Sequence, residues 1–420
     1  MKRLALLFLP IFAHADTWPA FRGPTGDGHS KATGIPLEWS ETKNVGWKTP
    51  IPGKGWSTPL VSETQIWVTT ATEDGKEMSY LCLDRKTGKV LKETVLFKNA
   101  TTEPLGNPVN GYASPTGILD GDHVILHFGS YGTACIDTKS FQVLWERKDL
   151  PCRHYRGPGS SLFGYKNLVV LSMDGVDVQY LVALDKATGK TVWKTDRSTK
   201  WDDLQPDGKP KAEGDMRKAY TTPTLVKFPN GKEHLVSSGS KASFAYDPST
   251  GKEIWTATYN GYSNASSPGF ANGVIYLNTG YGKANLLAIP IDADSQGDLT
   301  SKISWQQTKR MPLRSSPLMV NDHIFVTSDD GHAAFLDPKT GEPAWSERQT
   351  ALFSGSPILV EGKILVCGEN GDCIWLDPSP TYKLISQSKL DSGMLASPVA
   401  VDHELYLRTR THLYRIEEKK

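Results

Sequence analysis

Aromatic and charged side chains recur just before a series of Ser-Pro and Thr-Pro dipeptides, and they are the main candidates for chemistry in this sequence. Arginine guanidinium groups can bind carboxylates and phosphates in a bidentate manner, and aromatic rings offer flat faces to a ligand. Brought together, these segments would form a polar, partly cationic cleft for a carboxylate, a phosphate or a sugar. The candidate ligand-binding residues are Trp56, Tyr112, His154, Tyr155, Arg156, Tyr220, Tyr262, Asn264 and Arg314.

The same residues are compatible with two other interpretations. Charged groups at a channel mouth can simply be solvated, and Tyr and Arg are also enriched where proteins bind one another. Arg156 and Arg314 belong to the third and sixth copies of a repeat, so a ligand that touches both must span the channel. We expect such a ligand to be anionic, because two confined guanidinium groups repel each other unless a counter-charge is present.

Motifs for catalysis and metal binding are weak. His154 could act as an acid or a base, but a solitary loop histidine is more often a hydrogen-bonding residue. The run from Asp292 to Asp298 resembles the start of a calcium loop, but Ile303 stands where the bidentate Glu would be, which favours an acidic surface loop. The sequence therefore predicts no particular catalytic residue and no metal site.

Four of the five cysteines fall into two kinds. Cys82 and Cys135 precede the last Asp of their repeats by two residues, at a position that Ala fills in other copies, which predicts small buried side chains. Cys367 and Cys373 flank a predicted hairpin turn and could face each other, so a disulfide between them is left open. No two cysteines are adjacent, and no Cys-x-x-Cys-His motif for haem attachment is present.

The candidate residues are carried by a unit that recurs about eight times. Each unit has three short apolar runs and ends on Asp, usually followed by Thr-Gly-Lys and then Trp. Gly, Pro, Asn and Asp bound the runs, as expected for an antiparallel meander. The unit openings are Ser57-Thr58-Pro59, Ser114-Pro115, Ser160-Ser161, Thr222-Pro223, Ser267-Pro268, Ser316-Pro317, Ser356-Pro357 and Ser397-Pro398.

This repeat predicts an all-β, eight-bladed β-propeller of four-stranded antiparallel blades, with a linear solenoid as the alternative. The last unit, from Ser397, lacks a fourth strand with a Trp, whereas Trp47 precedes the first opening. The N-terminal segment, residues 16–50, should therefore supply the outer strand of the last blade and close the ring. The repeated tryptophans should be wedges between blades; they are Trp145, Trp193, Trp255, Trp305 and Trp345.

Composition and the first residues predict an exported protein. A formal net charge of +1 argues against a nucleic-acid or anionic-membrane partner. Residues 1–15 are typical of a cleaved signal peptide, with an apolar run too short to span a bilayer and no nearby cysteine for a lipid. We therefore expect one propeller domain over residues 16–420, periplasmic or secreted, monomeric and without a membrane span.

The turn Asp-x-x-Thr-Gly-Lys-x-x-Trp, together with the Ser-Pro openings, resembles the pyrroloquinoline-quinone (PQQ) repeat. The resemblance covers nearly the whole chain after the signal segment and implies the PQQ-like eight-bladed propeller family, within the WD40/YVTN-like superfamily. That family includes quinoprotein dehydrogenases and the propeller lipoprotein of the β-barrel assembly machine. The opening from Trp18 to Ser30 further resembles exported, uncharacterised members.

The family's dehydrogenases hold PQQ between a Trp and a ring of adjacent cysteines, with calcium on Glu, Asn and Asp, and this sequence lacks the cysteine ring. We therefore expect a scaffold without a cofactor that binds a protein or a small anionic or carbohydrate ligand at its loop face. A dehydrogenase of an alcohol or sugar that uses PQQ and calcium is the alternative, and a non-quinone enzyme acting on a carbohydrate is a third hypothesis. Whether the protein is an enzyme is left open, with binding favoured.

Overall fold

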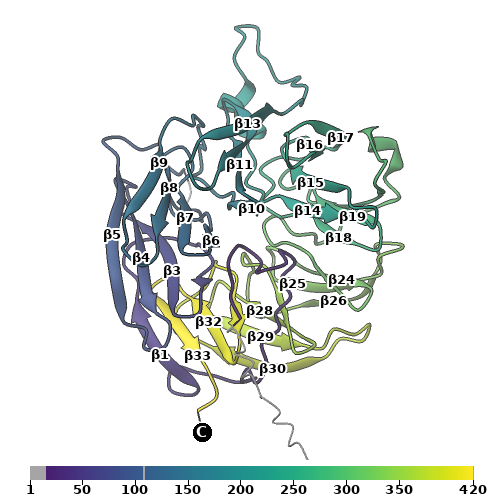
Figure 1. Cartoon of the computed structure of the whole chain (residues 1–420). Helices are drawn as coiled ribbons and strands as arrows, with labels where there is room; N and C mark the ends of the chain where they lie inside the picture. The colour runs from purple at the N-terminus through teal and green to yellow at the C-terminus, as the bar shows by residue number, and fades with distance from the viewer. Residues whose placement is uncertain (1–15, 107–108, 420) are drawn as a thin grey trace, which may run out of the picture.

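The structure, a computed structural model, describes residues 16–106 and 109–419, which form a ring of eight antiparallel sheets (Figure 1). In each sheet, or blade, the strands are hydrogen-bonded in the order inner to outer. This confirms the predicted all-β, eight-bladed propeller. The predicted signal peptide, residues 1–15, lies outside the described residues. In the part that is described, no helix is long and apolar enough to cross a membrane.

The strands of the first four blades are short, as the spacing of turn residues predicts. Blade 1 contains β2 (Leu60–Val61), β3 (Gln65–Ala71), β4 (Glu77–Asp84) and β5 (Val90–Lys98). Blade 2 contains β6 (Ile118–Asp120), β7 (His123–His127), β8 (Thr133–Asp137) and β9 (Val143–Arg147). Blade 3 contains β10 (Phe163–Tyr165), β11 (Leu168–Asp174), β12 (Gln179–Asp185) and β13 (Thr191–Asp196). Blade 4 contains β14 (Thr224–Lys227), β15 (Glu233–Ser238), β16 (Ala242–Tyr246) and β17 (Glu253–Thr258).

The second half of the chain repeats this pattern and ends in a composite blade. Blade 5 contains β18 (Gly269–Ala271), β19 (Val274–Asn278), β20 (Leu286–Pro290) and β22 (Trp305–Gln307). Blade 6 contains β23 (Leu318–Val320), β24 (His323–Thr327), β25 (His332–Leu336) and β26 (Pro343–Arg348). Blade 7 contains β27 (Ile358–Val360), β28 (Lys363–Cys367), β29 (Asp372–Leu376) and β30 (Leu384–Lys389). Blade 8 contains β31 (Val399–Val401), β32 (Glu404–Arg408), β33 (His412–Ile416) and β1 (Val45–Pro50).

Ring closure takes place in blade 8. β1 pairs antiparallel with β33, with Trp47 opposite Arg415. The first strand of the chain therefore completes the last blade, as predicted, and the two edges that an open array would expose are joined. Trp47 then packs on Gly88 of blade 1, the same contact that tryptophans make elsewhere in the ring.

At several junctions, the repeated turn of one blade packs on a tryptophan of the preceding blade. In the turn after β12, Asp185 accepts hydrogen bonds from the Thr188 amide and hydroxyl at 2.9 and 2.8 Å. Gly189 has φ +69, and a Cβ there would lie 2.6 Å from the Trp145 ring of blade 2. The Trp145 indole N–H donates to the Lys186 carbonyl at 2.8 Å. Trp193 and Trp305 pack in the same way on Gly251 and Gly341 of the next blade, whereas the Trp255 indole donates to His234 of its own blade.

The predicted wedge tryptophans differ in burial. Trp255 is 1% exposed, and Trp193 and Trp345 are each 8% exposed. Trp145 and Trp305 are half-buried. All five pack against hydrophobic core residues, so their structural role agrees with the prediction.

The repeat openings form a ring of hydroxyl groups around the channel. The Thr58 amide donates to the Thr116 hydroxyl at 2.9 Å, and the Thr116 amide donates to the Ser161 hydroxyl at 3.0 Å. The second opening is therefore Thr116, and the prediction of Ser114 was wrong by two residues because Ser114-Pro115 imitates the motif. The hydroxyl ring consists of Thr58, Thr116, Ser161, Thr222, Ser267, Ser316, Ser356 and Ser397, and six of its steps carry this amide-to-hydroxyl bond.

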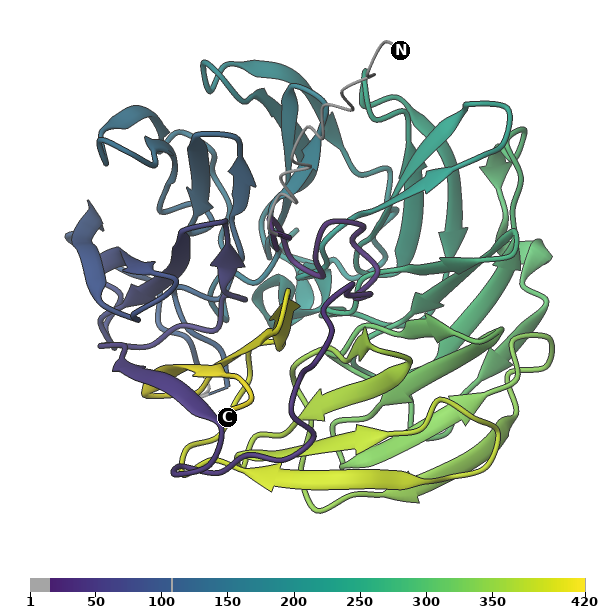
Figure 2. The same cartoon turned by 60° about the horizontal axis from the view of Figure 1, so that its bottom comes forward.

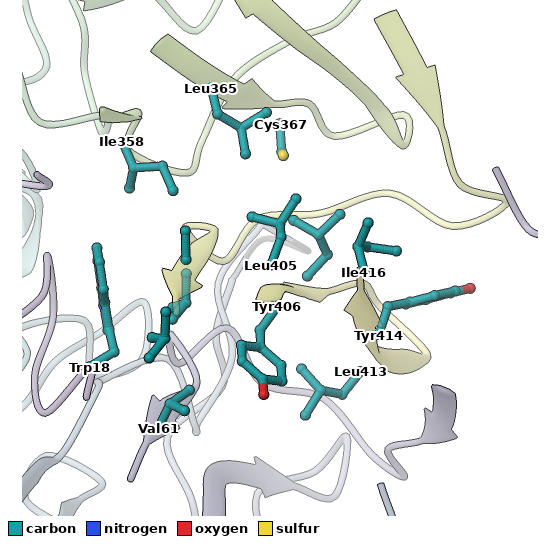
Figure 3. Close-up of a cluster of buried hydrophobic side chains, with 14 of the residues drawn as sticks. Trp18, Val61, Ile358, Leu365, Cys367, Leu405, Tyr406, Leu413, Tyr414 and Ile416 are labelled. Atoms are coloured by element: carbon teal, nitrogen blue, oxygen red, sulfur yellow. The ribbon is translucent and has the colours of Figure 1, made fainter. Parts of the chain in front are cut away.

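The N-terminal segment before β1 crosses one end of the channel, as the dark purple trace in Figure 2 shows. Trp18 exchanges backbone hydrogen bonds with Val61 of blade 1, and Gly28 and Ser30 bond Leu359 of blade 7. Trp18 also belongs to a hydrophobic cluster that joins blades 1, 7 and 8 (Figure 3). This segment therefore ties together the inner strands of blades 1 and 7, which lie on either side of blade 8.

Two insertions depart from the repeat. Residues 201–217 form an insertion that ends in η1 (Lys211–Arg217), a 3-10 segment interrupted by non-helical residues 212–214, and a salt bridge between Arg217 and Asp203 at 2.5 Å holds it. The acidic run from Asp292 continues into β21 (Gly297–Asp298), which adds a fifth strand to blade 4, and η2 (Thr300–Lys302). Among the residues that the structure describes, no group of three or more His, Cys, Asp or Glu side chains is placed to hold a metal ion.

Candidate functional site

A chamber of about 510 Å³ lies in the channel on the face formed by the loops that precede the inner strands. Its wall includes six members of the hydroxyl ring. Phe21 of the N-terminal segment also lines it, and the next residue, Arg22, bonds the backbone of blades 6 and 7. The N-terminal segment therefore forms the floor, and the chamber opens toward the loop-rich face.

The hydroxyl ring gives the wall a particular polarity. Thr116 and Ser161, for example, each accept an amide hydrogen from the preceding blade, which uses a lone pair of the hydroxyl oxygen. The hydroxyl hydrogens remain to be donated, since a hydroxyl is both an acceptor and a donor. The wall can therefore donate hydrogen bonds to a ligand rich in acceptor oxygens.

Five of the nine predicted ligand-binding residues line the chamber: Trp56, Arg156, Tyr220, Tyr262 and Arg314. They come from the loops before blades 1, 3, 4, 5 and 6. The geometric rule used on the sequence, that segments before the openings meet at one mouth, thus places residues far apart in the chain around one space.

The other four predicted residues support the wall from behind. Tyr112 is buried and donates its hydroxyl to the Glu103 carbonyl at 2.7 Å. Asn264 is fully buried and donates to the Asn278 carbonyl at 2.5 Å. The Tyr155 ring lies 4.8 Å beneath the Arg156 guanidinium, where it can hold that group in place.

His154 is a buried structural residue in this fold. Its Nε2 accepts the Ser130 amide at 3.1 Å, and its Nδ1 lies 3.6 Å from the Cys152 sulfur. Burial lowers the pKa of His154 to about 4, against a smaller opposing effect of Asp177. The imidazole is therefore neutral near pH 7 and does not line the chamber, which leaves it without a role in acid–base chemistry there.

One cationic group on the wall combines Arg156, Lys218 and Asp215. The Lys218 ammonium contacts the Asp215 carboxylate, and Arg156 Nε lies 3.9 Å from the same carboxylate. Burial lowers the pKa of Lys218, against the opposing effect of Asp215. The sequence analysis did not identify Lys218 and Asp215 as site residues. They lie in or beside an insertion that has no counterpart in the other repeats, so the repeat pattern could not place them.

A second charged group on the wall contains Arg314 and two carboxylates. The Arg314 guanidinium contacts Asp329 and lies 3.4 Å from Glu369. Burial acts to lower the pKa of Arg314, but Asp329, Tyr281 and Glu369 together outweigh it and the pKa is raised. Arg156 and Arg314 therefore already have carboxylate neighbours, and the expectation that only a ligand can relieve their repulsion is weakened.

Two further arginines lie behind the wall, and among the described residues no carboxylate is hydrogen-bonded to either of them. Arg22 donates to the backbone carbonyls of Asp27, Pro317 and Pro357. Arg408 donates to the Ser57 carbonyl and hydroxyl and to the Thr69 carbonyl. Burial lowers the pKa of Arg22 to about 10 and that of Arg408 to about 9, so both remain cationic near pH 7 and make the chamber more positive.

Aromatic rings complete the mouth. The Trp56 indole N–H donates to the Val109 carbonyl at 2.9 Å, and the Arg410 guanidinium lies 5.5 Å from the ring centre. Across the chamber, the Tyr262 and Tyr281 rings lie 6.4 Å apart. Flat faces beside cations and hydroxyls suit a ring-shaped ligand that carries acidic or hydroxyl groups.

These features define an eight-bladed propeller of PQQ-type repeats whose channel is closed at one end. The chain belongs to the protein family described as outer membrane protein assembly factor BamB, whose sequence model matches residues 37–151, 177–299 and 296–380.

The chain is also similar to larger proteins. The 1-butanol dehydrogenase (quinone) of Thauera butanivorans is 28% identical over 229 residues, which make up 50% of this chain and 32% of that protein. The chain thus matches about a third of the length of this curated relative.

Two solved structures have the same fold. BamB from Moraxella catarrhalis has a TM-score of 0.58 at 12% identity, covering 89% of this chain and 99% of that one. Quinohemoprotein alcohol dehydrogenase from Comamonas testosteroni has a TM-score of 0.64 at 12% identity, covering 96% and 81%. At such low identity, these structures support the architecture and nothing finer.

A dehydrogenase-type PQQ site does not fit the described residues. All five cysteines are buried, and none of them lines the chamber. The calcium that accompanies the cofactor needs oxygen ligands, including carboxylates, at one point. The chamber's carboxylates are instead engaged by Lys218 and Arg314.

Proposed function

We propose that this protein is an exported scaffold that holds a small anionic or carbohydrate ligand in the chamber on its loop-rich face. The observation that carries the proposal is the chamber, floored by the N-terminal segment, with cations, aromatic rings and hydroxyl donors around one space. A volume of about 510 Å³ falls in the range of small-molecule sites. Export is inferred from the signal-like residues 1–15.

The chemistry of the wall favours a ligand with several acceptor oxygens. Arg156 and Lys218 meet at Asp215, and Arg314 belongs to a different loop, the one before blade 6, so positive side chains reach the chamber from two parts of its wall. The hydroxyl ring can donate to the same ligand from below. A carboxylated or phosphorylated sugar meets these demands together, because its ring can also lie on an aromatic face.

A protein partner is a second candidate, favoured by the family to which the chain belongs. The same Tyr, Trp and Arg side chains are typical of protein interfaces. A chamber of this size, open only toward the loops, admits a side chain or a chain end. A folded partner would instead rest on the surrounding loops. The two candidates therefore differ in whether the chamber wall itself is needed.

The proposal can be tested by calorimetry with glucuronate, glucose 6-phosphate and citrate as anionic probes and glucose as the neutral probe. We expect at least one anionic probe to bind and the combined variant R156A/R314K to bind it at least about tenfold more weakly, a loss of about 1.4 kcal/mol. Lysine at position 314 keeps a positive charge beside the buried Asp329, which protects the fold.

The opposite face of the ring supplies the matched control. Lys190, Lys252 and Lys339 lie in the repeated turns, so K190A/K252A/K339A removes three cations without changing the chamber. We expect this variant to bind as the wild type does. If it loses binding while R156A/R314K keeps it, or if no anionic probe binds, the chamber is not the ligand site.

A quinone-dependent dehydrogenase remains the alternative, because the sequence is similar to a quinone-linked 1-butanol dehydrogenase. We expect no tight binding of PQQ in the presence of calcium, since the cysteine ring is absent. Calorimetry with PQQ and Ca²⁺, together with the visible absorption of the mixture, tests this expectation. Stoichiometric binding would contradict it and favour the dehydrogenase.

A further inference from the structure

We propose that Cys367 and Cys373 form a disulfide that fixes the turn between β28 and β29 at the rim of the chamber. The two residues are direct partners across this hairpin. Their sulfur atoms lie 2.8 Å apart, and the residues are 2% and 0% exposed. Figure 3 shows the sulfur of Cys367 near Leu365, inside the hydrophobic cluster.

The hydrogen-bond pattern of the hairpin favours the bridge. The Gly368 amide donates to the Asp372 carbonyl at 2.7 Å, so these two residues form a hydrogen-bonded pair. Pairs alternate along an antiparallel ladder, which makes Cys367 and Cys373 a non-hydrogen-bonded pair with Cα atoms about 4.5 Å apart. This separation lies within the range that disulfides span.

Other blades tie the same position by other means. In blade 2, His127 and Thr133 are the corresponding partners and share a hydrogen bond of 2.8 Å. In blade 4, Ser238 and Ser243 share one of 2.7 Å between their hydroxyls. Side chains therefore link the second and third strands at the equivalent pair in blades 2 and 4. In blade 7 the equivalent pair consists of the two cysteines.

The reaction is a two-electron oxidation. Two S–H bonds break, one S–S bond forms, and two protons and two electrons pass to the disulfide of a thiol oxidase in the exported compartment, which becomes a dithiol. Both cysteines are buried in the finished blade, and burial raises the pKa of the Cys373 thiol. Oxidation therefore takes place during folding, while the hairpin is still accessible.

The bridge acts on the chamber through the turn that it closes. That turn carries Glu369, which accepts a hydrogen bond from the Ser354 hydroxyl at 2.5 Å and lies 3.4 Å from Arg314. Ser354 and Arg314 both line the chamber. The disulfide itself does not depend on the proposed ligand, so the two ideas can fail separately.

Mass spectrometry of the full chain, expressed with export and alkylated under denaturing conditions without reductant, tests the bond. Both cysteines fall in one tryptic peptide, residues 364–383. We expect this peptide to be unalkylated and two hydrogens lighter than its dithiol form, and the three other cysteines to be alkylated. Double alkylation of the peptide in the unreduced protein would overturn the proposal.

Hydrogen exchange tests the effect on the turn. The double variant C367S/C373S reproduces the Ser238–Ser243 arrangement of blade 4 and should fold. We expect the amides of residues 368–372 to exchange at least about tenfold faster in this variant than in the oxidised wild type, and the amides around Ser238 to be unchanged. Equal exchange at residues 368–372 would show that the bond does not fix the turn.

Discussion

Glycine in the repeated turns meets two demands at once, and only one of them is visible in a sequence. Gly189 takes a positive φ, which any turn of this type requires, and it also leaves room for the Trp145 ring of the blade before. A motif that links Gly and Trp within one unit is in fact a contact between units. The Trp and the Gly that touch therefore belong to consecutive copies of the repeat.

Replacing Gly189 by Ala should lower the free energy of unfolding by about 1–3 kcal/mol, through backbone strain together with a clash against Trp145. Gly121 is the matched control, because it has φ +62 and nothing within 4 Å of an added Cβ. G121A should cost about 1 kcal/mol, from the backbone alone. Urea unfolding of both variants measures the difference, and equal losses would rule out the inter-blade contact as a cause.

His154 gives the stability a specific dependence on pH. Its pKa is about 4 in the folded protein and about 6.5 when unfolded. Between these values the unfolded chain binds a proton that the native protein does not, so stability falls as the pH drops from about 6.5 to 4. The loss attributable to this residue is up to about 3 kcal/mol.

The variant H154Q should therefore show a shallower decline of stability over this pH range than the wild type, whatever its stability at pH 7. Exposed His403 supplies the control H403Q, whose pH profile should follow the wild type. Unfolding free energies measured at several pH values test this. An unchanged slope in H154Q would mean that other groups carry the acid sensitivity.

Between blades, the tryptophans contribute unequally because their burial differs. Trp255 is 1% exposed and packs with Leu287 and Ile289 of blade 5, whereas Trp145 is half-buried. We expect W255A to cost about 3–5 kcal/mol, the usual range for a large core aromatic, and W145A to cost less. Chemical denaturation gives both values, and the reverse order would contradict the burial argument.

At the level of elements, the sequence predicts the strands well and the insertions poorly. Most turns carry Asp, Gly or Asn, so most strand positions follow from local chemistry. The chamber is harder, because Asp215, Lys218 and Phe21 lie outside the repeats and reach it only through long-range packing. His154 and Asn264 lie in the expected loops, but their side chains are buried behind the wall. The spacing of the repeat predicts the loop and does not predict which way a side chain in it points.

At the level of the whole molecule, the N-terminal segment closes the ring and also forms the floor of the chamber. Deleting residues 16–50 should destabilise the entire propeller, because it removes β1 and exposes an edge of β33. Calorimetric unfolding should show a lower or missing transition. A deletion of residues 16–40, which keeps β1, should retain a cooperative transition, although a weakened one, since Trp18 and Trp39 leave the hydrophobic cluster. An unchanged melting temperature in the longer deletion would contradict ring closure.

The pairing of β1 with β33 also governs when the molecule can become complete. Val45 and Ile416 are partners, yet nearly the whole chain separates them in sequence. A chain that emerges from a ribosome or a translocation pore cannot make this contact until its last strand is free. Because contacts of such long sequence separation form slowly, the propeller must persist as an open arc of blades and then shut in one late step. During that interval β33 presents an unpaired edge, so the time before closure is when this protein is most exposed to aggregation and proteolysis.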